Sequence, residues 1–432
     1  MFAPELWPAG ASVDDRGRLR VDGVDVASLA ERYGTPLYVY EAATMRLSYR
    51  AYVAAFRAHR PVRVSYAIKA CAIRGVARVL SAIGADASTA SLGEMLAARR
   101  AGFPPARIQL HGNAKTDEEL RAALRLGIGR IVIDGADELA RLAVLVRRWR
   151  RPPAKVWLRV SPGIGADTHP HLRTGVLDSK FGVPIAGGDA LAQARAIAAT
   201  RGLALVGVHA HLGTQLHEAE RYAEFGAALA SFARDVRDAT AVRVSEIGVG
   251  GGLGIRLRPE DPVLDLDAYA AAVSAPIRAE PATAKATLVI EPGRSLVGRA
   301  GIALYRVVGT KRVAGVRTFV SVDGGMGDNI RPSLYGAEYS ALLAERAAAA
   351  PSERVAIAGR YCESGDLLIR DVALPTPRTD EVLAIPAAGA YSLAMASNYN
   401  HHPRPAVVLI DGGRAHVIRA RESHTDIWRL ER

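Results

Sequence analysis

The feature that most constrains the fold is a strand-then-helix rhythm that repeats between about residues 62 and 294. β-Branched, apolar runs alternate with alanine- and leucine-rich segments whose apolar residues recur at i, i+3 and i+4, as in amphipathic helices. The expected strands are 62–68, 85–88, 108–111, 131–134, 156–160, 205–211, 247–250 and 288–291, and the clearest helices are 116–126, 137–148, 190–200 and 219–237. About eight such units predict an α/β fold with a (β/α)8 barrel of the TIM type. A doubly wound open sheet is the structural alternative.

Beyond residue 294 the pattern changes to short β-branched runs separated by Gly, Pro and Asp, which predicts a mostly antiparallel β domain. The expected strands are 307–313, 318–322, 354–358, 382–385, 406–410 and 415–419, with one helix over 340–350. A strand-like stretch over 18–26 suggests that the N-terminal segment joins this domain. The predicted domains are a barrel over 38–294 and a β domain formed by 1–37 and 295–432.

Composition limits the class of protein. Hydrophobic residues make up 49% of the 432-residue chain, which is ample for a large core. No apolar run approaches the roughly 18 residues of a membrane span. The N-terminus lacks the basic and apolar regions of a signal peptide. Two cysteines are too few for a disulfide framework, so a reducing cytoplasm is the expected location.

The net charge of +12 raises the question of a nucleic-acid partner. The densest basic cluster, residues 147–151, lies at the end of an expected helix just before Pro152 and Pro153, and elsewhere arginines alternate with alanine and acidic residues. We therefore expect a solvated helix end, and neither a nucleic-acid nor a membrane partner. The basic balance still helps to attract an anionic substrate or cofactor.

Polar residues collect where the expected strands end, which is the catalytic face of a barrel. This set comprises Lys69, His111, Arg159, His209, His211, the glycine loop 250–254, Glu291 and Arg294. Considered by itself, Lys69 is best explained as a surface lysine. The polar residues at the other strand ends change this interpretation, and they favour a partly desolvated Lys69 amine that can form a Schiff base.

Several of these residues have both a functional and a structural interpretation. The loop containing Gly251 and Gly252 can cradle a phosphate, or it is a tight turn. Glu291 can bind a protonated pyridine nitrogen, or it pairs with Arg294. His211 can stack on a cofactor ring, or it is a core histidine. If His211 stacks on a ring, Thr214 can reach the phosphate, and Arg294 can add a further phosphate contact. Together these parts fit pyridoxal 5'-phosphate (PLP), and no metal site is predicted.

The chain resembles the alanine-racemase-like barrel decarboxylases that use PLP, and among them most closely the diaminopimelate decarboxylases. The resemblance runs from about Gly34 to the C-terminus. It rests on Tyr66-Ala-Ile-Lys69-Ala, His111-Gly-Asn-Ala-Lys115, Thr168-His-Pro-His-Leu-Arg-Thr-Gly175, Lys180-Phe-Gly182, His209-Ala-His-Leu-Gly-Thr-Gln215, Gly250-Gly-Gly-Leu-Gly254, Glu291-Pro-Gly-Arg294, Asp323-Gly-Gly-Met-Gly-Asp-Asn-Ile-Arg331-Pro-Ser-Leu-Tyr335, Cys362-Glu-Ser-Gly-Asp366 and Gly389-Ala-Tyr391.

The resemblance implies a role for each matching residue. Lys69 is the Schiff-base lysine and His211 stacks on the cofactor ring. Cys362 donates a proton and reaches the barrel of a partner subunit, which implies a homodimer with composite active sites. The cofactor contacts would further include Thr214, Gly251, Gly252, Glu291, Gly293, Arg294 and Tyr391, and the substrate contacts Arg294, Arg331, Tyr335, Glu363 and Tyr391.

The implied activity is PLP-dependent decarboxylation of meso-2,6-diaminopimelate to L-lysine and CO2. Arg331 offers a planar fork to the distal carboxylate and Glu363 an anion to the distal amine. Tyr335 is followed by Gly336, whereas ornithine-type relatives carry an acidic residue there.

The sequence departs from the family pattern at Cys71, Ala114 and Leu92. A decarboxylase of another diamino or carrier-bound amino acid, an amino-acid racemase and a non-catalytic PLP carrier remain alternatives.

Overall fold

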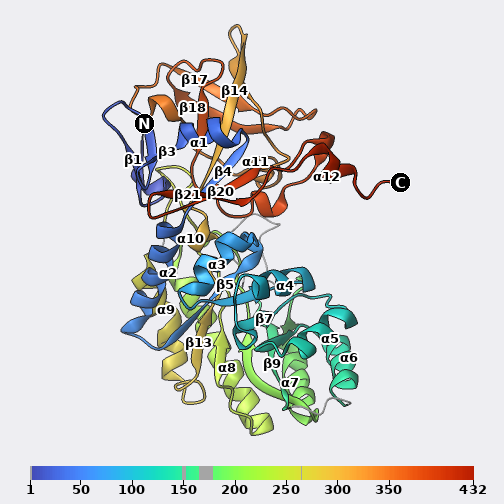
Figure 1. The fold of residues 1–432 in the computed structure, drawn as a ribbon. Coiled ribbons are helices and arrows are strands. Elements are labelled where there is room, and N and C mark those ends of the chain that lie inside the picture. Colours follow the sequence, from blue (N-terminus) through green and yellow to red (C-terminus); the bar gives the residue numbers. More distant parts are fainter. Residues whose placement is uncertain (1, 148–151, 165–178, 264) are drawn as a thin grey trace. The chain divides into compact units, whose positions relative to one another are not determined.

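The computed structural model describes residues 2–147, 152–164, 179–263 and 265–432 (Figure 1). The chain divides into two compact units. The barrel unit comprises Tyr49–Gly254 and Val263–Gly293, and the β unit comprises Met1–Ser48, Ile255–Pro262 and Arg294–Arg432. Two features of the sequence lie outside the described residues: positions 148–151 of the basic cluster and the whole motif 168–175.

Parallel strands close into a barrel in the order β9-β11-β12-β13-β5-β6-β7-β8, and β8 pairs with β9 to complete the ring. Their bounds are β5 (Val62–Ala67), β6 (Asp86–Thr89), β7 (Ile108–Leu110), β8 (Arg130–Ile133), β9 (Ala154–Ser161), β11 (Leu203–His209), β12 (Glu246–Gly248) and β13 (Thr287–Ile290), and β10 (Val183–Pro184) extends the sheet beside β9. The predicted (β/α)8 barrel is confirmed, because an open doubly wound sheet would leave two unpaired edges.

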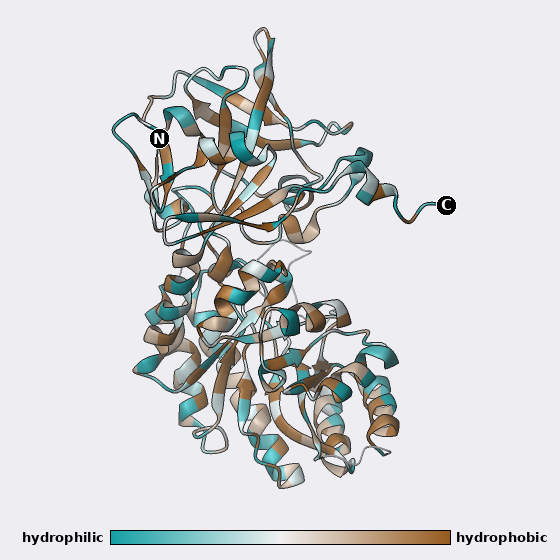
Figure 2. Ribbon diagram, viewed as in Figure 1, coloured by the Kyte–Doolittle hydropathy of each residue, from teal (hydrophilic) through white to brown (hydrophobic). Residues whose placement is uncertain are grey.

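Helices follow the strands on the outside of the barrel (Figure 1). They are α2 (Ala42–Arg57), α3 (Arg74–Ala82), α4 (Leu92–Arg100), α5 (Asp117–Leu126), α6 (Ala136–Arg147), α7 (Asp189–Ala199), α8 (Ala219–Thr240) and α9 (Leu266–Ala279), with the 3₁₀ turns η2 (Ile68–Ala70), η3 (Pro105–Arg107) and η5 (Ala186–Gly188). Hydrophilic and hydrophobic residues lie side by side along these helices, as expected for amphipathic segments (Figure 2).

Helix α5 shows how the sequence sets these boundaries. The Thr116 hydroxyl accepts the Glu119 backbone N–H at 3.2 Å, and the Glu119 carboxylate accepts the Thr116 N–H at 2.8 Å. This capping box satisfies backbone donors that the first turn leaves free. At the other end Gly127 adopts φ 63°, a left-handed conformation that glycine takes without strain.

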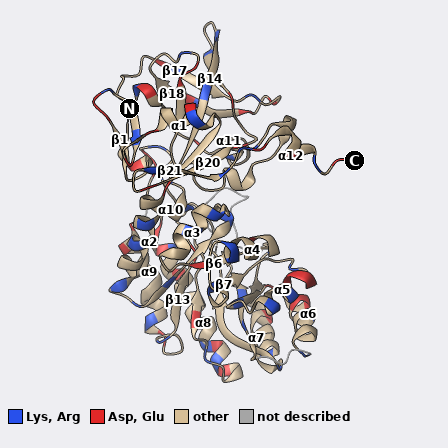
Figure 3. Cartoon of the chain, in the orientation of Figure 1, with Lys and Arg blue, Asp and Glu red and all other residues tan. Residues whose placement is uncertain are grey.

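Lys and Arg alternate with Asp and Glu over the helices of the barrel unit (Figure 3). The charged residues therefore form no single-sign stripe along the described helices of this unit.

No helix in the described ranges combines the length and apolar character needed to cross a membrane.

A large aromatic side chain, Trp157 of β9, lies inside the barrel. It is fully buried and forms a small apolar cluster with Val132 and Val289. A Cβ at Gly207 would come within 2.6 Å of the indole, and one at Gly248 within 2.9 Å of it. These two glycines on neighbouring strands therefore make the space that the indole occupies.

A buried ion cluster lies beneath Trp157, at the N-terminal ends of the strands. Glu246 accepts hydrogen bonds from the Trp157 indole N–H at 2.8 Å and from Arg130 Nε at 2.7 Å. The Arg63 guanidinium lies 3.2 Å from the Glu246 carboxylate and 2.5 Å from the Asp86 carboxylate, so it bridges the two acids. Burial would raise the Glu246 pKa, but the hydrogen bonds from Arg130 and Trp157 and the charges of Arg130 and Arg63 together outweigh it, and the pKa is lowered.

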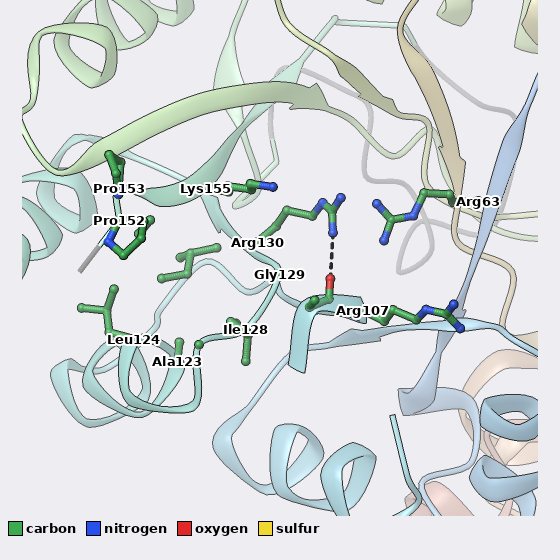
Figure 4. A pocket seen from close by; sticks show the side chains of 14 residues that line it. Arg63, Arg107, Ala123, Leu124, Ile128, Gly129, Arg130, Pro152, Pro153 and Lys155 are labelled. Carbon is green, nitrogen blue, oxygen red and sulfur yellow. Dashed lines mark hydrogen bonds between the residues drawn. The ribbon is translucent and has the colours of Figure 1, made fainter. Parts of the chain in front are cut away.

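A cavity of about 570 Å³ opens at this same end of the barrel (Figure 4). Arg63, Arg107, Arg130 and Lys155 line it, and Arg130 donates to the Ala106 carbonyl at 3.1 Å. The cavity lies at the ends of the strands opposite to those that carry the predicted catalytic residues.

The β unit is built around a second sheet, with strand order β18-β17-β15-β14-β4-β20-β21, in which β14 also pairs with β19 and β19 with β16. The bounds are β4 (Leu37–Glu41), β14 (Gly301–Val313), β15 (Arg317–Val322), β16 (Leu342–Leu343), β17 (Glu353–Ala358), β18 (Leu367–Leu374), β19 (Val382–Ile385), β20 (Ala406–Asp411) and β21 (Arg414–Arg419). The pairs β15–β17 and β4–β20 are parallel and the other pairs are antiparallel, so the predicted mostly antiparallel sheet is confirmed.

The N-terminal segment belongs to this unit, as the sequence indicated. It forms β1 (Ala11–Val13), β2 (Leu19–Val21) and β3 (Val24–Asp25), preceded by η1 (Pro4–Leu6) and followed by α1 (Val26–Tyr33). Leu6, Trp7 and Leu19 are buried in one apolar cluster with Ile302 of β14 and Val408 of β20. Further along the chain the unit adds α10 (Arg294–Val297), α11 (Arg331–Tyr335), α12 (His424–Trp428), η6 (Ala344–Arg346), η7 (Leu393–Met395) and η8 (Tyr399–His401).

The helix expected over residues 340–350 is wrong. Leu342 and Leu343 form β16 and pair with Ala384 and Leu383 of β19, and only a 3₁₀ turn follows. Both leucines are buried. Pairing and burial in the sheet therefore override the helix propensity of the alanine-rich sequence.

A buried carboxyl group, Asp328, lies among polar side chains of the β unit. Tyr305 donates to its Oδ1 at 2.5 Å, Tyr38 to the same atom at 3.3 Å, and the Gly325 N–H to its Oδ2 at 3.1 Å. Burial raises the pKa of Asp328 to about 7, although the hydrogen bond from Tyr305 opposes the shift.

This shift predicts a pH-dependent component of stability. The folded chain holds the Asp328 proton up to about pH 7, whereas the unfolded chain releases it near the ordinary value of 3.8, so stability falls as the pH rises between these values. The component amounts to about 4 kcal/mol across the window. We expect Asp328→Asn to remove it, as measured by denaturant unfolding at several pH values. The exposed Asp371→Asn variant is the control, and an unchanged pH profile in Asp328→Asn would contradict the prediction.

Candidate functional site

Two histidines and a glutamate meet at the C-terminal ends of the barrel strands. Glu291 follows β13, His111 follows β7 and His209 ends β11. His111 Nε2 lies 2.8 Å from Glu291 Oε1, and His209 Nε2 lies 2.9 Å from Glu291 Oε2. All three residues are buried, and the His209 ring stacks on Trp157 with centroids 6.0 Å apart and an interplanar angle of 11°.

The carboxylate of Glu291 is held ionised by these neighbours. An unpaired buried carboxylate costs several kcal/mol, and the charge-assisted hydrogen bond from His209 returns about 1.5–3 kcal/mol. Burial would raise the Glu291 pKa, but His111 and His209 outweigh it and keep the pKa well below its usual range. Burial also lowers the pKa of His209 to about 4, so near pH 7 this imidazole is neutral and donates its Nε2–H.

The ligand atoms of Glu291, His111 and His209 lie within 4.8 Å of one another, a spacing that could also suit a metal ion. In the structure His209 Nε2 makes a hydrogen bond with Glu291 Oε2, and His111 Nε2 lies 2.8 Å from Glu291 Oε1. The sequence pointed to both histidines only as polar strand ends and assigned them no role.

Lys69 lies in the turn η2, directly after β5. Burial lowers the pKa of His211 and the Lys69 charge adds to this shift, whereas burial raises the pKa of Glu94 and the Lys69 charge opposes that shift; the ammonium therefore lies near both side chains. Gly293 secures the turn from the other side, because a Cβ there would approach Ala67 and Ala70 to 3.2 Å. The Lys69 side chain is exposed, so the expectation of a partly desolvated amine is wrong for this structure.

The hydrogen bond of His211 defines its tautomer. The Gly251 N–H donates to His211 Nδ1 at 3.3 Å, so Nδ1 is an acceptor and the proton of the neutral ring lies on Nε2. Burial, reinforced by the Lys69 charge, lowers the His211 pKa well below its usual range. A neutral, half-buried imidazole is suited to stacking on an aromatic ring.

The glycine loop after β12 packs tightly on its neighbours. A Cβ at Gly251 would collide with the Glu291 carbonyl oxygen, and one at Gly252 with the Gly213 carbonyl oxygen. Leu216 N–H donates to the Gly252 carbonyl at 3.0 Å. The loop is thereby fixed against the segment that carries half-buried Thr214.

Two buried arginines in the β unit surround one tyrosine ring. The guanidinium carbons of Arg294 and Arg331 lie 4.9 and 5.9 Å from the Tyr391 centroid, and Arg331 lies 5.3 Å from that of Tyr335. The Nε atoms of both arginines are buried and have no hydrogen-bond partner among the described residues. Burial, followed by the Arg331 charge, lowers the Arg294 pKa to about 10, so Arg294 remains cationic near neutrality. The pair is suited to binding an anion.

Cys362 and Glu363 are exposed in a loop of the β unit. Asp366 holds this loop, because its carboxylate accepts the Met326 N–H at 2.6 Å and the Tyr361 N–H at 2.8 Å. Neither Cys362 nor Cys71 forms a disulfide.

The structure thus assigns the predicted site residues to two sets. Lys69, His211, Thr214, Gly251, Gly252, Glu291 and Gly293 lie in the barrel unit, and Arg294, Arg331, Tyr335, Cys362, Glu363 and Tyr391 lie in the β unit. Arg159, at the end of β9, stacks on Phe181 at 4.3 Å, with its Nε 3.8 Å from Asp134.

The barrel set fits PLP. Its groups comprise an amine on Lys69, a neutral imidazole on His211, an ionised carboxylate on Glu291 and a glycine loop whose close backbone approach excludes side chains. A protonated pyridine nitrogen needs such a carboxylate, and a phosphate needs such a loop.

Known proteins place the chain in a family. The family model described as "Pyridoxal-dependent decarboxylase, pyridoxal binding domain" matches residues 43–298. The diaminopimelate decarboxylase of Bacillus subtilis (strain 168) is 39% identical over 422 residues, covering 97% of this chain and 96% of that protein. That of Actinosynnema pretiosum subsp. auranticum is 41% identical over 433 residues, covering 99% and 95%.

The crystal structure of diaminopimelate decarboxylase from M. jannaschii in complex with L-lysine aligns with a TM-score of 0.91 at 31% identity and covers 98% of each chain. The alignment therefore spans both the barrel unit and the β unit. The chain belongs to the pyridoxal-dependent decarboxylase family, in the group that the diaminopimelate decarboxylases form.

Proposed function

We propose that the protein is a PLP-dependent carboxy-lyase that converts meso-2,6-diaminopimelate to L-lysine and CO2, the last step of lysine biosynthesis. The observation that carries the proposal is the ionised Glu291 carboxylate, which is held by His111 and His209 at the mouth of the barrel. Full-length similarity to diaminopimelate decarboxylases supports the choice of substrate.

The barrel residues would hold the cofactor, which supplies an electron sink for the pair of electrons left when CO2 departs. Lys69 would bind its aldehyde carbon through the amine. Glu291 would keep a proton on the pyridine nitrogen, because an anion at this position favours the protonated ring. His211 would cover one face of the ring, and Thr214, Gly251, Gly252 and Gly293 would border the phosphate.

The β-unit residues would bind the substrate. Arg294 and Arg331 offer two cationic groups around Tyr391, which matches a substrate with a carboxylate at each end. Glu363 would receive the distal ammonium. Cys362 would donate its Sγ proton to the α-carbon after CO2 has left, since a thiol is a competent general acid.

We further propose that two subunits share their sites. The exposed positions of Cys362 and Glu363 support this arrangement, because both remain accessible to a second copy of the chain. A cytoplasmic location agrees with two cysteines that form no disulfide and with a biosynthetic role.

The first test concerns Lys69. We expect Lys69→Ala to abolish the visible absorbance of the PLP-loaded protein and the release of CO2 from meso-diaminopimelate, because the amine that binds the cofactor is lost. Lys155→Ala, which removes an exposed lysine at the opposite end of the barrel, is the matched control and should keep both signals. An undiminished absorbance band in Lys69→Ala would remove Lys69 from this role.

Arg331 should determine the substrate. Arg331→Leu should lower kcat/KM for meso-diaminopimelate by roughly 30-fold to several thousand-fold, because truncating one partner of a buried charge pair costs about 2–5 kcal/mol. The assay follows CO2 release from meso-diaminopimelate, L-lysine and L-ornithine, with the exposed Arg354→Leu as control. A wild-type preference for a substrate without a distal carboxylate would instead identify a related decarboxylase.

Sharing of sites can be tested by complementation. Lys69→Ala and Cys362→Ala homodimers should each have little activity, whereas mixing them should restore up to about a quarter of the wild-type value if each site combines two chains. Activity would be measured after subunit exchange. No recovery despite demonstrated exchange would indicate that each chain forms a complete site.

A further inference from the structure

Two consecutive residues, Tyr399 and Asn400, hydrogen-bond to the two consecutive residues proposed to act on the substrate. The Tyr399 hydroxyl donates to Glu363 Oε1 at 2.6 Å, and the Cys362 N–H donates to Asn400 Oδ1 at 2.9 Å. The Tyr399 ring also stacks on Tyr361, the residue before Cys362, with centroids 6.0 Å apart and planes 10° apart. Three contacts thus connect two short segments that lie far apart in the sequence.

The segment 397–402 is itself anchored at both ends. The Ser397 N–H donates to the Gly327 carbonyl at 2.8 Å, and the His402 ring packs edge-on against Tyr361 at 5.1 Å. Asn398 Nδ2 donates to Glu422 at 2.8 Å. Tyr399 and Asn400 therefore project from a fixed stretch of backbone.

Asn400 adopts a left-handed backbone conformation, with φ 52° and ψ 24°, and His401 follows with φ 56°. Two successive non-glycine residues in this region are uncommon and carry a conformational cost. Asparagine tolerates the conformation better than most side chains. Glycine would tolerate it better still, but it lacks the carboxamide that receives the Cys362 N–H.

Global stability does not account for these contacts. Cys362, Glu363, Tyr399 and Asn400 are all exposed, and Tyr399 retains 40% of its accessible surface. Solvent competes for exposed hydrogen bonds, so their net contribution to folding is small. Their main effect is on the local geometry of the Cys362–Glu363 backbone and side chains.

In the hydrogen bond between Tyr399 and Glu363, the phenol is the donor and the carboxylate is the acceptor. The hydrogen bond to the Glu363 carboxylate raises the pKa of Tyr399, so the phenol remains protonated and continues to donate. A donor at Oε1 orients the carboxylate and leaves Oε2 for an incoming ammonium group.

We infer that Tyr399 and Asn400 are positioning residues: Asn400 fixes the backbone that carries Cys362, and Tyr399 orients the Glu363 carboxylate toward the distal ammonium of the substrate. The inference rests on the proposed function and names residues to which that proposal gave no role. The loss of Asn400 should therefore affect protonation by Cys362, and the loss of Tyr399 should affect recognition of the ammonium by Glu363.

The kinetic test compares Tyr399→Phe with Asn400→Gly, which preserves the left-handed backbone and removes only the carboxamide. Tyr399→Phe should raise KM for meso-diaminopimelate about tenfold with little change in kcat. Asn400→Gly should lower kcat about tenfold and increase its solvent deuterium isotope effect, because protonation becomes slower. Both variants should keep the wild-type cofactor absorbance and thermal unfolding midpoint.

Matched controls come from the same unit. Tyr33→Phe removes another phenol hydroxyl, and Asp380→Gly places glycine at another exposed residue with positive φ, 72°. Both controls should keep wild-type KM and kcat. Unchanged kinetics in Tyr399→Phe and Asn400→Gly, or equal losses accompanied by a lower unfolding midpoint, would overturn the inference.

A second measurement is independent of turnover. Iodoacetamide should alkylate Cys362 selectively, because Cys71 is buried. Asn400→Gly should change the rate of Cys362 alkylation several-fold, whereas Asp380→Gly should not. An unchanged rate would refute the positioning of Cys362 by Asn400. A changed rate in a protein that does not decarboxylate meso-diaminopimelate would retain the positioning role and reject the proposed function.

Discussion

Two hydrogen bonds and one ring stack run in series through the interior of the barrel and connect its two ends. At the mouth Glu291 is bound by His209, whose ring stacks on Trp157, and the Trp157 indole donates to Glu246 at the base. Neither carboxylate could remain ionised in this interior without its donors, since an isolated buried charge costs several kcal/mol. The tryptophan inside the barrel therefore also sets the orientation of the imidazole that serves the reactive end.

The sequence predicted the barrel well, because strand and helix periodicities are local and each of its eight units repeats them. It also indicated which strand ends carry polar groups. The central role of Trp157 could not be foreseen, since a tryptophan in an apolar strand does not reveal whether it faces the interior or the surrounding helices. The need for Gly207 and Gly248 beside it follows only from the three-dimensional arrangement.

Predictions for the β unit were less complete, for identifiable reasons. Strand β18 was missed because Arg370 and Asp371 interrupt its apolar pattern, and the expected helix over 340–350 yielded to pairing with β19. The roles of Arg331 and Cys362 came from resemblance rather than from periodicity. Tyr391 and Asn400 have positive φ values of 61° and 52°, a property that non-glycine residues do not signal in a sequence.

The position of β4 has a consequence for the order in which the chain can assemble during synthesis. This strand lies between β14 and β20, yet it leaves the ribosome before any strand of the barrel, and both of its partners leave after the last one. The barrel strands can pair among themselves as soon as β13 has emerged, whereas β4 must wait, unpaired and apolar, until β14 has followed the whole barrel. Residues 37–41 of the nascent chain therefore need protection from aggregation until their partner strands have been synthesised.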